Sequence, residues 1–247
     1  MYHITERLSR KIFRNLSKEK QKNRLTFPAV CGKVLAMKRN DVVERATELV
    51  GGFSKPSKMP CLSWSISAKR CKTGAKLLKV KGSICSTCYA LKGNYGFPIV
   101  KAAHERRFQS LQSPQWTSAM IVAIRGNESS GFFRWHDSGD LQSLEHFKKL
   151  VEIARALPDI KFWLPTREYG IVASFLRTDS MPENLIVRLS AYMLEGEPPA
   201  LAKRLGLTTS GVTKTGFTCP ASNQGGKCLT CRACWSKDVL NVNYKKH

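Results

Sequence analysis

The sequence predicts an α/β fold in which parallel strands are joined by crossover helices. Between residues 100 and 192, short apolar segments alternate with amphipathic segments of helical periodicity. Each strand–helix–strand unit is long enough for a crossover, and polar residues follow three of the apolar segments. A partial or full α/β barrel, or an open α/β sheet, would satisfy this pattern.

The sequence predicts two parts: a basic helical extension, residues 1–55, and an α/β core, residues 56–247. Residues 4–20 place apolar side chains at helical spacing, which predicts a basic amphipathic helix that packs on the core or docks on nucleic acid. Its basic residues are Arg7, Arg10, Lys11, Arg14 and Lys18. Residues 40–50 predict a second helix, capped at Asn40 and ended by Gly51 and Gly52. Residues 53–99 are expected to be rich in loops.

The chain from about residue 100 onward supplies the strands and the crossovers. Helices are expected at 100–112, 116–125, 141–158 and 171–178, and strands at 131–140, 160–170 and 184–192. Asp140 is the expected N-cap of the helix that begins at residue 141.

The chain carries a large positive charge. It has 41 Lys and Arg against 18 Asp and Glu, a net charge of +23. Such a field attracts phosphate backbones largely without sequence preference, which favours a nucleic-acid partner, DNA or RNA, with an anionic membrane surface as the competitor. Lys69, Arg70 and Lys72 join the helical residues as candidate contacts. No apolar segment is long enough to span a membrane, and a cytoplasmic protein is expected.

Eight of the nine cysteines form two groups of four, and structural disulfides are not expected in such a chain. The C-terminal group is Cys219, Cys228, Cys231 and Cys234, in which three cysteines follow one another at C-x2-C spacing. This run is typical of the ligands of a [4Fe–4S] cluster, although a zinc site could use the same four thiolates. The first group, Cys61, Cys71, Cys85 and Cys88, is more widely spaced and predicts a second metal site. The two metal-binding segments are residues 57–90 and 217–236.

Polar residues at the ends of three predicted strands form a candidate pocket, because the carboxyl ends of parallel strands meet at one edge of a sheet. The candidate catalytic residues are His136, Asp137, Ser138, Asp140, Arg167 and Arg188, and the candidate cofactor-binding residues are Gly139, Thr166 and Ser190. Helix capping and ion pairing are the alternative roles for these side chains.

Several segments resemble the phage "gene 88 protein" family of phages and mobile elements. They are CYA at 88–90, FRWHDSGD at 133–140, PDIKFW at 158–163, Thr166-Arg167, and the closing Cys219-Pro220 with the C-terminal cysteine run and Trp235. The resemblance covers roughly residues 57–247. The CYA tripeptide is also similar to phage proteins related to radical-SAM enzymes. It implies an iron–sulfur protein with a radical-SAM-like partial barrel, located in the host cytoplasm if phage-encoded, and it supplies no activity.

The chain departs from the radical-SAM pattern at its first cysteines. Those enzymes use C-x3-C-x2-C, which leaves one iron open for S-adenosylmethionine, and no cysteine stands four residues before Cys85. If all four cysteines of the first group bound one cluster, no iron would be open; if Cys61 or Cys71 were not a ligand, an open iron would return. We expect an iron–sulfur protein that binds nucleic acid, with a radical-SAM-like enzyme modifying nucleic acid, or a zinc-stapled interaction module, as alternatives.

Overall fold

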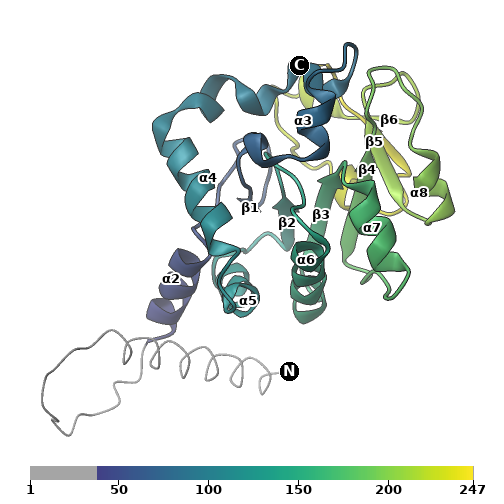
Figure 1. Cartoon of the computed structure of the whole chain (residues 1–247). Helices are drawn as coiled ribbons and strands as arrows, with labels where there is room; N and C mark the ends of the chain where they lie inside the picture. The colour runs from purple at the N-terminus through teal and green to yellow at the C-terminus, as the bar shows by residue number, and fades with distance from the viewer. Residues whose placement is uncertain (1–37, 247) are drawn as a thin grey trace, which may run out of the picture.

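The computed structural model describes residues 38–246, and its centre is a seven-stranded sheet in which every neighbouring pair of strands is parallel (Figure 1). The strand order is β1-β2-β3-β4-β5-β7-β6. The strands are β1 (Ser63–Trp64), β2 (Phe132–Trp135), β3 (Lys161–Thr166), β4 (Leu185–Ser190), β5 (Thr208–Gly211), β6 (Phe217–Thr218) and β7 (Asn241–Asn243). The predicted α/β class with parallel strands is confirmed.

Helices connect the strands, and short 3-10 turns occupy the cysteine-rich segments. The α-helices are α2 (Arg39–Leu49), α3 (Thr73–Leu77), α4 (Pro98–Ser110), α5 (Trp116–Asn127), α6 (Leu144–Ala156), α7 (Tyr169–Leu176) and α8 (Ala200–Arg204). The 3-10 turns are η1 (Ala68–Arg70), η2 (Ile84–Thr87), η3 (Tyr89–Leu91), η4 (Gly93–Gly96), η5 (Pro220–Asn223) and η6 (Ala233–Trp235). The helix predicted over residues 4–20 lies outside the described residues.

Two predicted helix caps were wrong. The helix after β2 begins at Leu144, and the hydroxyl of Ser143 accepts the amide hydrogen of His146, so Ser143 is the N-cap. Asp140 lies three residues earlier and uses its carboxylate elsewhere. The first described helix begins at Arg39, one residue before the predicted cap Asn40, and no side chain caps it.

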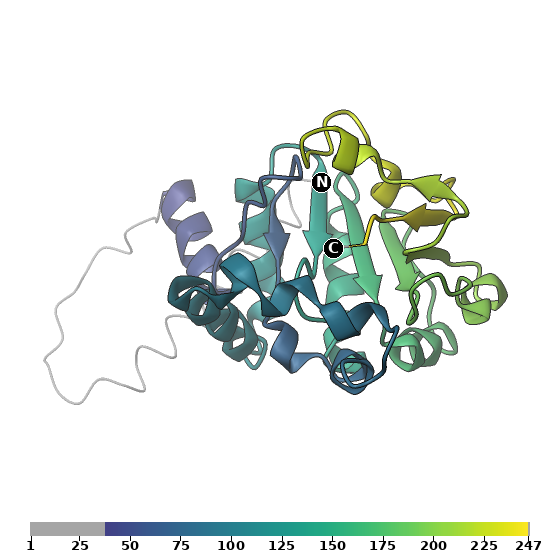
Figure 2. The ribbon, with the colours of Figure 1, turned by 90° about the horizontal axis from the view of Figure 1, so that it is seen from above.

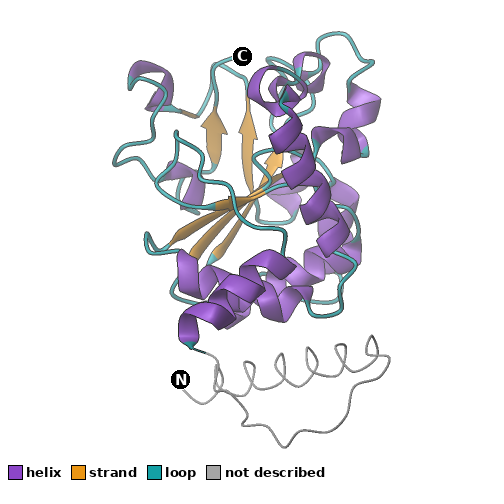
Figure 3. Ribbon diagram, turned by 90° about the vertical axis from the view of Figure 1, so that its left-hand side faces the viewer, coloured by secondary structure: helices purple, strands orange, loops and turns teal. Residues whose placement is uncertain are grey.

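Helices cover one face of the sheet and form the main hydrophobic core there (Figure 3). Alternate residues of the strands point to this face because successive strand side chains lie on opposite sides. Phe133 and Phe162 from neighbouring strands pack with their ring centroids 5.8 Å apart, and Phe147 of α6 packs against Phe175 of α7. Each such fully buried side chain contributes roughly 1.5–3 kcal/mol. Ala46 and Val50, in and after α2, also belong to this core.

The other face of β3 and β4 is covered by the C-terminal segment, which has little regular structure (Figure 2). Trp235 of η6 packs edge-on against Trp163 of β3, with ring centroids 5.2 Å apart, and its indole N–H donates to the carbonyl of Phe133. We call this side the loop face and the opposite side the helical face.

Arg188 of β4 fastens the C-terminal segment to the loop face. Its side chain is 0% exposed. The guanidinium donates hydrogen bonds of 2.7–3.1 Å to five backbone carbonyls, those of Thr209, Ala233, Cys234, Ser236 and Val239. A segment with little regular structure exposes many carbonyls that lack helix or sheet partners, and one buried guanidinium satisfies four of them here, together with the Thr209 carbonyl of β5.

None of the helices among residues 38–246 combines the length and the apolar composition that crossing a lipid bilayer requires.

Replacing Arg188 with Lys is expected to lower the free energy of unfolding by about 3 kcal/mol or more. Lysine has at most three donors, so at least two buried carbonyls lose their partner. Urea unfolding measures the loss, and Arg155→Lys is the control because Arg155 pairs with Asp179 at the surface. Equal, small losses in both variants would contradict a fastening role for Arg188.

Candidate metal centre

The structure divides the eight described cysteines into a group of three and a group of five, and all eight are free thiols. Cys71, Cys85 and Cys88 influence one another electrostatically and form the three-thiol group. Cys61, which the sequence grouped with them, instead lies beside Cys228 in the hydrophobic cluster of Met59, Trp163 and Trp235. The second group therefore holds Cys61 together with Cys219, Cys228, Cys231 and Cys234.

Strand β1 explains this division. Cys61 precedes β1, whereas Cys71, Cys85 and Cys88 follow it. In a parallel sheet, residues before a strand lie at the amino edge and residues after it at the carboxyl edge. The three-thiol group accordingly lies at the carboxyl edge, where α3 stands above the arrowheads of β2 and β3 in Figure 1.

Gly74 of α3 lies between two of the three thiols. A Cβ atom placed on Gly74 would be 3.6 Å from Sγ of Cys71 and 3.7 Å from Sγ of Cys85, and only 2.9 Å from Cβ of Cys71. Both sulfurs thus face one small space that the absence of a side chain at residue 74 keeps open.

Glu168 attaches α3 to the end of β3. Its carboxylate accepts hydrogen bonds from the backbone N–H of Thr73, at 2.8 Å, and from the Thr73 hydroxyl, at 2.9 Å. A carboxylate at the first turn of a helix satisfies an otherwise unpaired amide. Because Thr73 lies between Cys71 and Gly74, this contact fixes the start of the three-thiol segment to the sheet.

Asp140 and Arg167 bring opposite charges to the three-thiol group. The Asp140 carboxylate accepts hydrogen bonds from the Thr166 hydroxyl, at 2.6 Å, and from the backbone N–H groups of Arg167 and Leu141. Burial raises the pKa of Asp140 to about 6, although these hydrogen bonds oppose the rise. Burial also raises the pKa of Cys71 and of Cys85, while the Arg167 guanidinium lowers both.

Asp137 joins the Cys88 loop to the sheet. Its carboxylate accepts hydrogen bonds from the hydroxyls of Ser63, Ser65 and Tyr95, and its backbone carbonyl accepts one from the hydroxyl of Tyr89. Tyr89 follows Cys88 directly. Asp137 is therefore a positioning residue for the loop that carries the third thiol.

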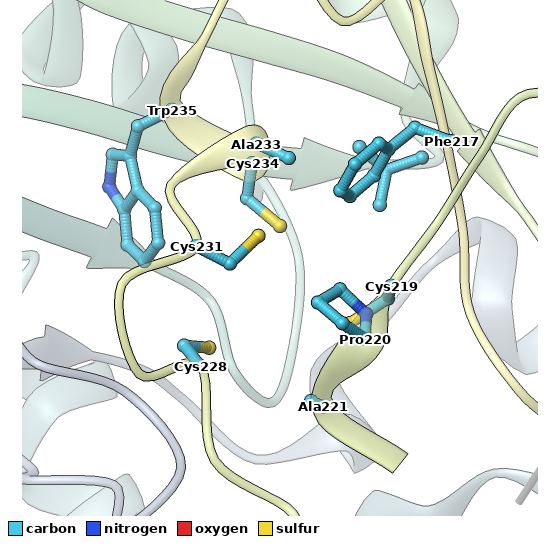
Figure 4. A pocket seen from close by; sticks show the side chains of 10 residues that line it. Phe217, Cys219, Pro220, Ala221, Cys228, Cys231, Ala233, Cys234 and Trp235 are labelled. Atoms are coloured by element: carbon cyan, nitrogen blue, oxygen red, sulfur yellow. The ribbon is translucent and has the colours of Figure 1, made fainter. Parts of the chain in front are cut away.

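Four cysteines of the second group line a pocket between the C-terminal segment and the sheet, and Cys61 is not part of its lining (Figure 4). Figure 4 shows Cys228, Cys231 and Cys234 on one side of the space and Cys219 with Pro220 across from them. The pocket is partly open to solvent, and the space that it encloses is small, about 10 Å³. The remaining lining side chains are apolar, those of Phe217, Pro220, Ala221, Ala233, Trp235 and Val242.

The buried thiols of the second group are protonated at neutral pH when no metal is bound. Burial raises the pKa of Cys61 to about 12, with a further rise from Glu128. Burial also raises the pKa of Cys234 to about 11, partly offset by the hydroxyl of Tyr244, which lies 3.2 Å from Sγ. Metal binding would have to displace these protons, which couples it to pH.

Among the described residues, no group of three or more His, Cys, Asp or Glu side chains is placed so as to hold a metal ion as the structure stands. The donor chemistry nonetheless suits one: a thiol pocket with apolar walls, and two thiols facing the space beside Gly74. Metal binding by either group is therefore a proposal.

The other predicted pocket residues fall in different layers. His136 has a left-handed φ of 54° and packs against Trp64 and His146 on the helical face, with no hydrogen-bond partner in residues 38–246 for either ring nitrogen. Burial lowers the pKa of His136 well below its ordinary value. Ser138 is buried, and its hydroxyl also has no partner within the described residues.

Gly139, Ser190 and Arg188 have visible packing roles. Gly139 has φ of +77°, and a Cβ there would lie 2.7 Å from the carbonyl oxygen of Ile66, so only glycine fits. The Ser190 hydroxyl lies 3.1 Å from that of Ser210. Arg188 binds the C-terminal segment rather than the carboxyl edge. Of the predicted pocket residues, Asp140 and Arg167 act electrostatically on the thiols of Cys71 and Cys85. The hydroxyl of Thr166 donates a hydrogen bond to Asp140.

The candidate nucleic-acid residues are partly described. Arg7, Arg10, Lys11, Arg14 and Lys18 lie outside residues 38–246. Lys69, Arg70 and Lys72 are exposed, but Arg70 pairs with Glu105 at 3.1 Å and covers the ring of Phe108, and Lys72 donates to the carbonyl of Gln142.

The family model for gene product 88 matches residues 9–237. The chain belongs to this family. The match begins well before residue 57, where the motif resemblance started, so most of the basic N-terminal part is included. No curated protein and no solved structure matches the chain.

Several residues of this gene product 88 protein that shape the two groups were not singled out from the sequence. Glu168 and Gly74 act through one contact and one missing side chain, which no local pattern reveals. Arg134 stacks over Trp163 at 4.3 Å and donates to Met59 on the loop face. Its place in a recognisable strand, opposite Phe133 and Trp135, was the only available signal.

Replacing Gly74 with Ala is expected to reduce metal incorporation by the three-thiol group while the fold stays intact. The added methyl group would occupy the space that the sulfurs of Cys71 and Cys85 face. Iron, sulfide and zinc per chain measure the effect after identical anaerobic loading. Gly170→Ala is the matched control, because Gly170 lies in the first turn of α7 with nothing within 4 Å of its added Cβ. Equal metal contents in the two variants would remove Gly74 from the site.

Acid is expected to destabilise the metal-free protein partly through His146. Burial lowers the pKa of His146 to about 3, so below about pH 6.5 the unfolded chain binds a proton that the folded chain does not. Stability from this residue is present above pH 6.5 and is lost as pH falls toward 3. His146→Asn keeps an acceptor for the amide of Gln142. Between pH 7 and 5 the wild type should lose about 2 kcal/mol more unfolding free energy than the variant; equal losses would contradict a neutral buried His146.

Proposed function

We propose that this gene product 88 protein is an iron–sulfur protein that binds nucleic acid. One cluster would be held by Cys71, Cys85 and Cys88, and another by Cys219, Cys228, Cys231 and Cys234. The observation that carries the proposal is the gathering of three thiols, beside Asp140 and Arg167, at the carboxyl edge of a parallel sheet. Ligands of open α/β sheets and of α/β barrels bind at this edge.

Iron is favoured over zinc by the spacing of the second group. A tetrahedral zinc site more often draws on two separated C-x2-C pairs. The C-x2-C-x2-C run of Cys228, Cys231 and Cys234 instead distributes thiols in the way that suits the separate irons of a cluster. A zinc-stapled module without chemistry of its own is the outcome that metal analysis would reveal.

The three-thiol group favours an enzyme as the second candidate function. With Cys61 at the other site, Cys71, Cys85 and Cys88 supply three thiolates, which leaves one iron of a four-iron cluster without a protein ligand. When bound, such a cluster would supply an open iron for S-adenosylmethionine and an electron for radical chemistry. The proposed architecture is then a radical-SAM-like partial barrel, and the reaction a modification of nucleic acid.

The surrounding residues have defined tasks in this proposal. The Arg167 guanidinium offsets the negative charge of a thiolate-bound cluster, since it already lowers the pKa of Cys71 and Cys85. Glu168 holds the start of α3, and Asp137 holds the loop after Cys88. Asp140, with a pKa of about 6, can hold or release a proton near neutral pH beside the thiols.

Nucleic-acid binding is supported by the net charge of +23 and by its uneven distribution. Residues 1–82 contain twenty basic and five acidic residues. A surplus of this size favours release of counterions from a phosphate backbone.

Anaerobic metal analysis and electron paramagnetic resonance test the proposal. Wild-type protein should contain about eight irons with matching sulfide, as two four-iron clusters require. Cys88→Ser and Cys231→Ser should each lose about half of the iron, whereas Cys61→Ser should retain it. Adding S-adenosylmethionine should change the spectrum of wild type and of Cys231→Ser, but not that of Cys88→Ser.

Three results would each contradict a part of the proposal. Colourless protein with stoichiometric zinc would support the zinc module instead. Iron loss in Cys61→Ser equal to that in Cys88→Ser would show that Cys61 binds a cluster together with the three-thiol group. A spectrum that S-adenosylmethionine leaves unchanged would contradict the radical-SAM-like enzyme but not the iron–sulfur protein.

A further inference from the structure

The segment that carries the three-thiol group also carries an exposed basic and apolar surface. We propose that this segment, residues 69–101, which we call the collar, binds single-stranded nucleic acid and holds it over the three-thiol group. The inference deepens the proposed function and rests on it for the chemistry that would follow binding. The binding itself depends only on charge and exposed side chains.

The charge of the collar has one sign. Residues 49–104 contain ten basic residues and no acidic residue. Seven lysines of the collar are exposed: Lys69, Lys72, Lys76, Lys79, Lys81, Lys92 and Lys101. The ammonium groups of Lys76, Lys79 and Lys81 have no hydrogen-bond or ion-pair partner within residues 38–246. Unpaired lysines on one segment supply the positive potential that a phosphate backbone requires.

Apolar side chains lie exposed among these lysines. Of the ten large hydrophobic residues exposed in the described part of the chain, six belong to the collar: Leu78, Val80, Tyr89, Leu91, Phe97 and Ile99. Phe97 is 55% exposed and Ile99 is 77% exposed. So much exposed apolar surface on one segment is a common mark of a binding surface.

The collar is placed over the candidate chemistry. Its short elements pack against one another: η1 contacts α3 and η3, α3 contacts η2, and η3 contacts η4. Together they carry Cys71, Cys85 and Cys88 at the carboxyl edge of the sheet (Figure 1). A single strand of nucleic acid bound along the collar would therefore pass the three thiols.

The distribution of side chains favours a single strand over a lipid surface. In Leu78-Lys79-Val80-Lys81 and in Leu91-Lys92, apolar residues alternate with lysines along the chain. Single-strand binding sites combine cations for phosphates with aromatic side chains on which bases stack, and Tyr89 and Phe97 are the exposed aromatic residues of the collar. An interfacial membrane helix instead needs a continuous apolar face, and the exposed apolar residues here are spread over several short turns. Duplex DNA keeps its bases stacked inside and offers little to Phe97 or Tyr89.

Fluorescence anisotropy with the full chain tests the collar. The probe is a labelled mixed-sequence strand of about 20 nucleotides, as DNA and as RNA, and the duplex of the same sequence is compared. The triple variant Lys76→Gln, Lys79→Gln, Lys81→Gln should bind the strand at least about tenfold more weakly. Its slope of log K against log salt should fall by about 2, since each phosphate contact on a single strand contributes about 0.7.

A charge-matched triple variant separates the collar from the general field of the protein. Lys148→Gln, Lys161→Gln, Lys203→Gln removes three exposed lysines from α6, from the start of β3 and from α8. This variant should stay within about twofold of wild type. Phe97→Ala should weaken binding with little change in the salt slope, because its ring carries no charge.

Four outcomes would overturn the inference. Equal losses of affinity in the two triple variants would mean that the general positive charge of the protein, and not the collar, binds the strand. No loss of affinity in the collar variant would place the binding site elsewhere. Equal or tighter binding of the duplex would exclude a single-strand site. Collar-dependent binding to vesicles containing anionic lipid, without binding to the strand, would show a membrane surface. Iron content measured in parallel distinguishes the two proposals, since the collar effect can persist in protein without clusters and clusters can form in protein without the collar effect.

Discussion

The arrangement of the second thiol group depends on the buried guanidinium of Arg188. The C-terminal segment covers β3 and β4 through η6, a 3-10 turn of three residues that satisfies few of its own backbone groups. Five carbonyls of this region and of β5 therefore converge on one side chain of β4. Because two of these carbonyls belong to Ala233 and Cys234, the hydrogen bonds that hold the segment also fix the end of the cysteine run against the sheet.

The carboxyl edge is built differently, from contacts between strand ends and the cysteine loops. Glu168 bonds Thr73 just after Cys71, and Asp137 bonds Tyr89 just after Cys88. Each tie is short in space but joins residues far apart in sequence, so the loops are positioned only when the sheet has formed. Metal would add to such ties in both groups, because binding that requires a folded arrangement of thiols contributes its free energy to folding.

The sequence predicted β2, β3 and β4 and the helices α4 to α7 because their apolar periodicity is strong, as in the stripe of Phe147, Leu150 and Val151 on α6. It did not predict β1, β5, β6 or β7, which are only two to four residues long. It misassigned Cys61 because β1 is only two residues long and gives no periodic signal. Without that strand, nothing indicates that the chain crosses from one edge of the sheet to the other between residues 61 and 71. The cap at Ser143 was missed for a related reason: the carboxylate of Asp140 bonds Thr166, which is 26 residues away.

Net charge alone also could not separate cations that build the fold from those that face outward. Arg188 and Arg107 are buried, and Arg107 donates to the carbonyl of Gly52. Arg134 is occupied by Trp163 and Met59 on the loop face. These guanidiniums suit buried positions because they donate several hydrogen bonds in fixed directions. The exposed positive charge of the described carboxyl edge consequently rests mainly on lysines, whose compact and mobile ammonium groups suit a phosphate backbone of variable path.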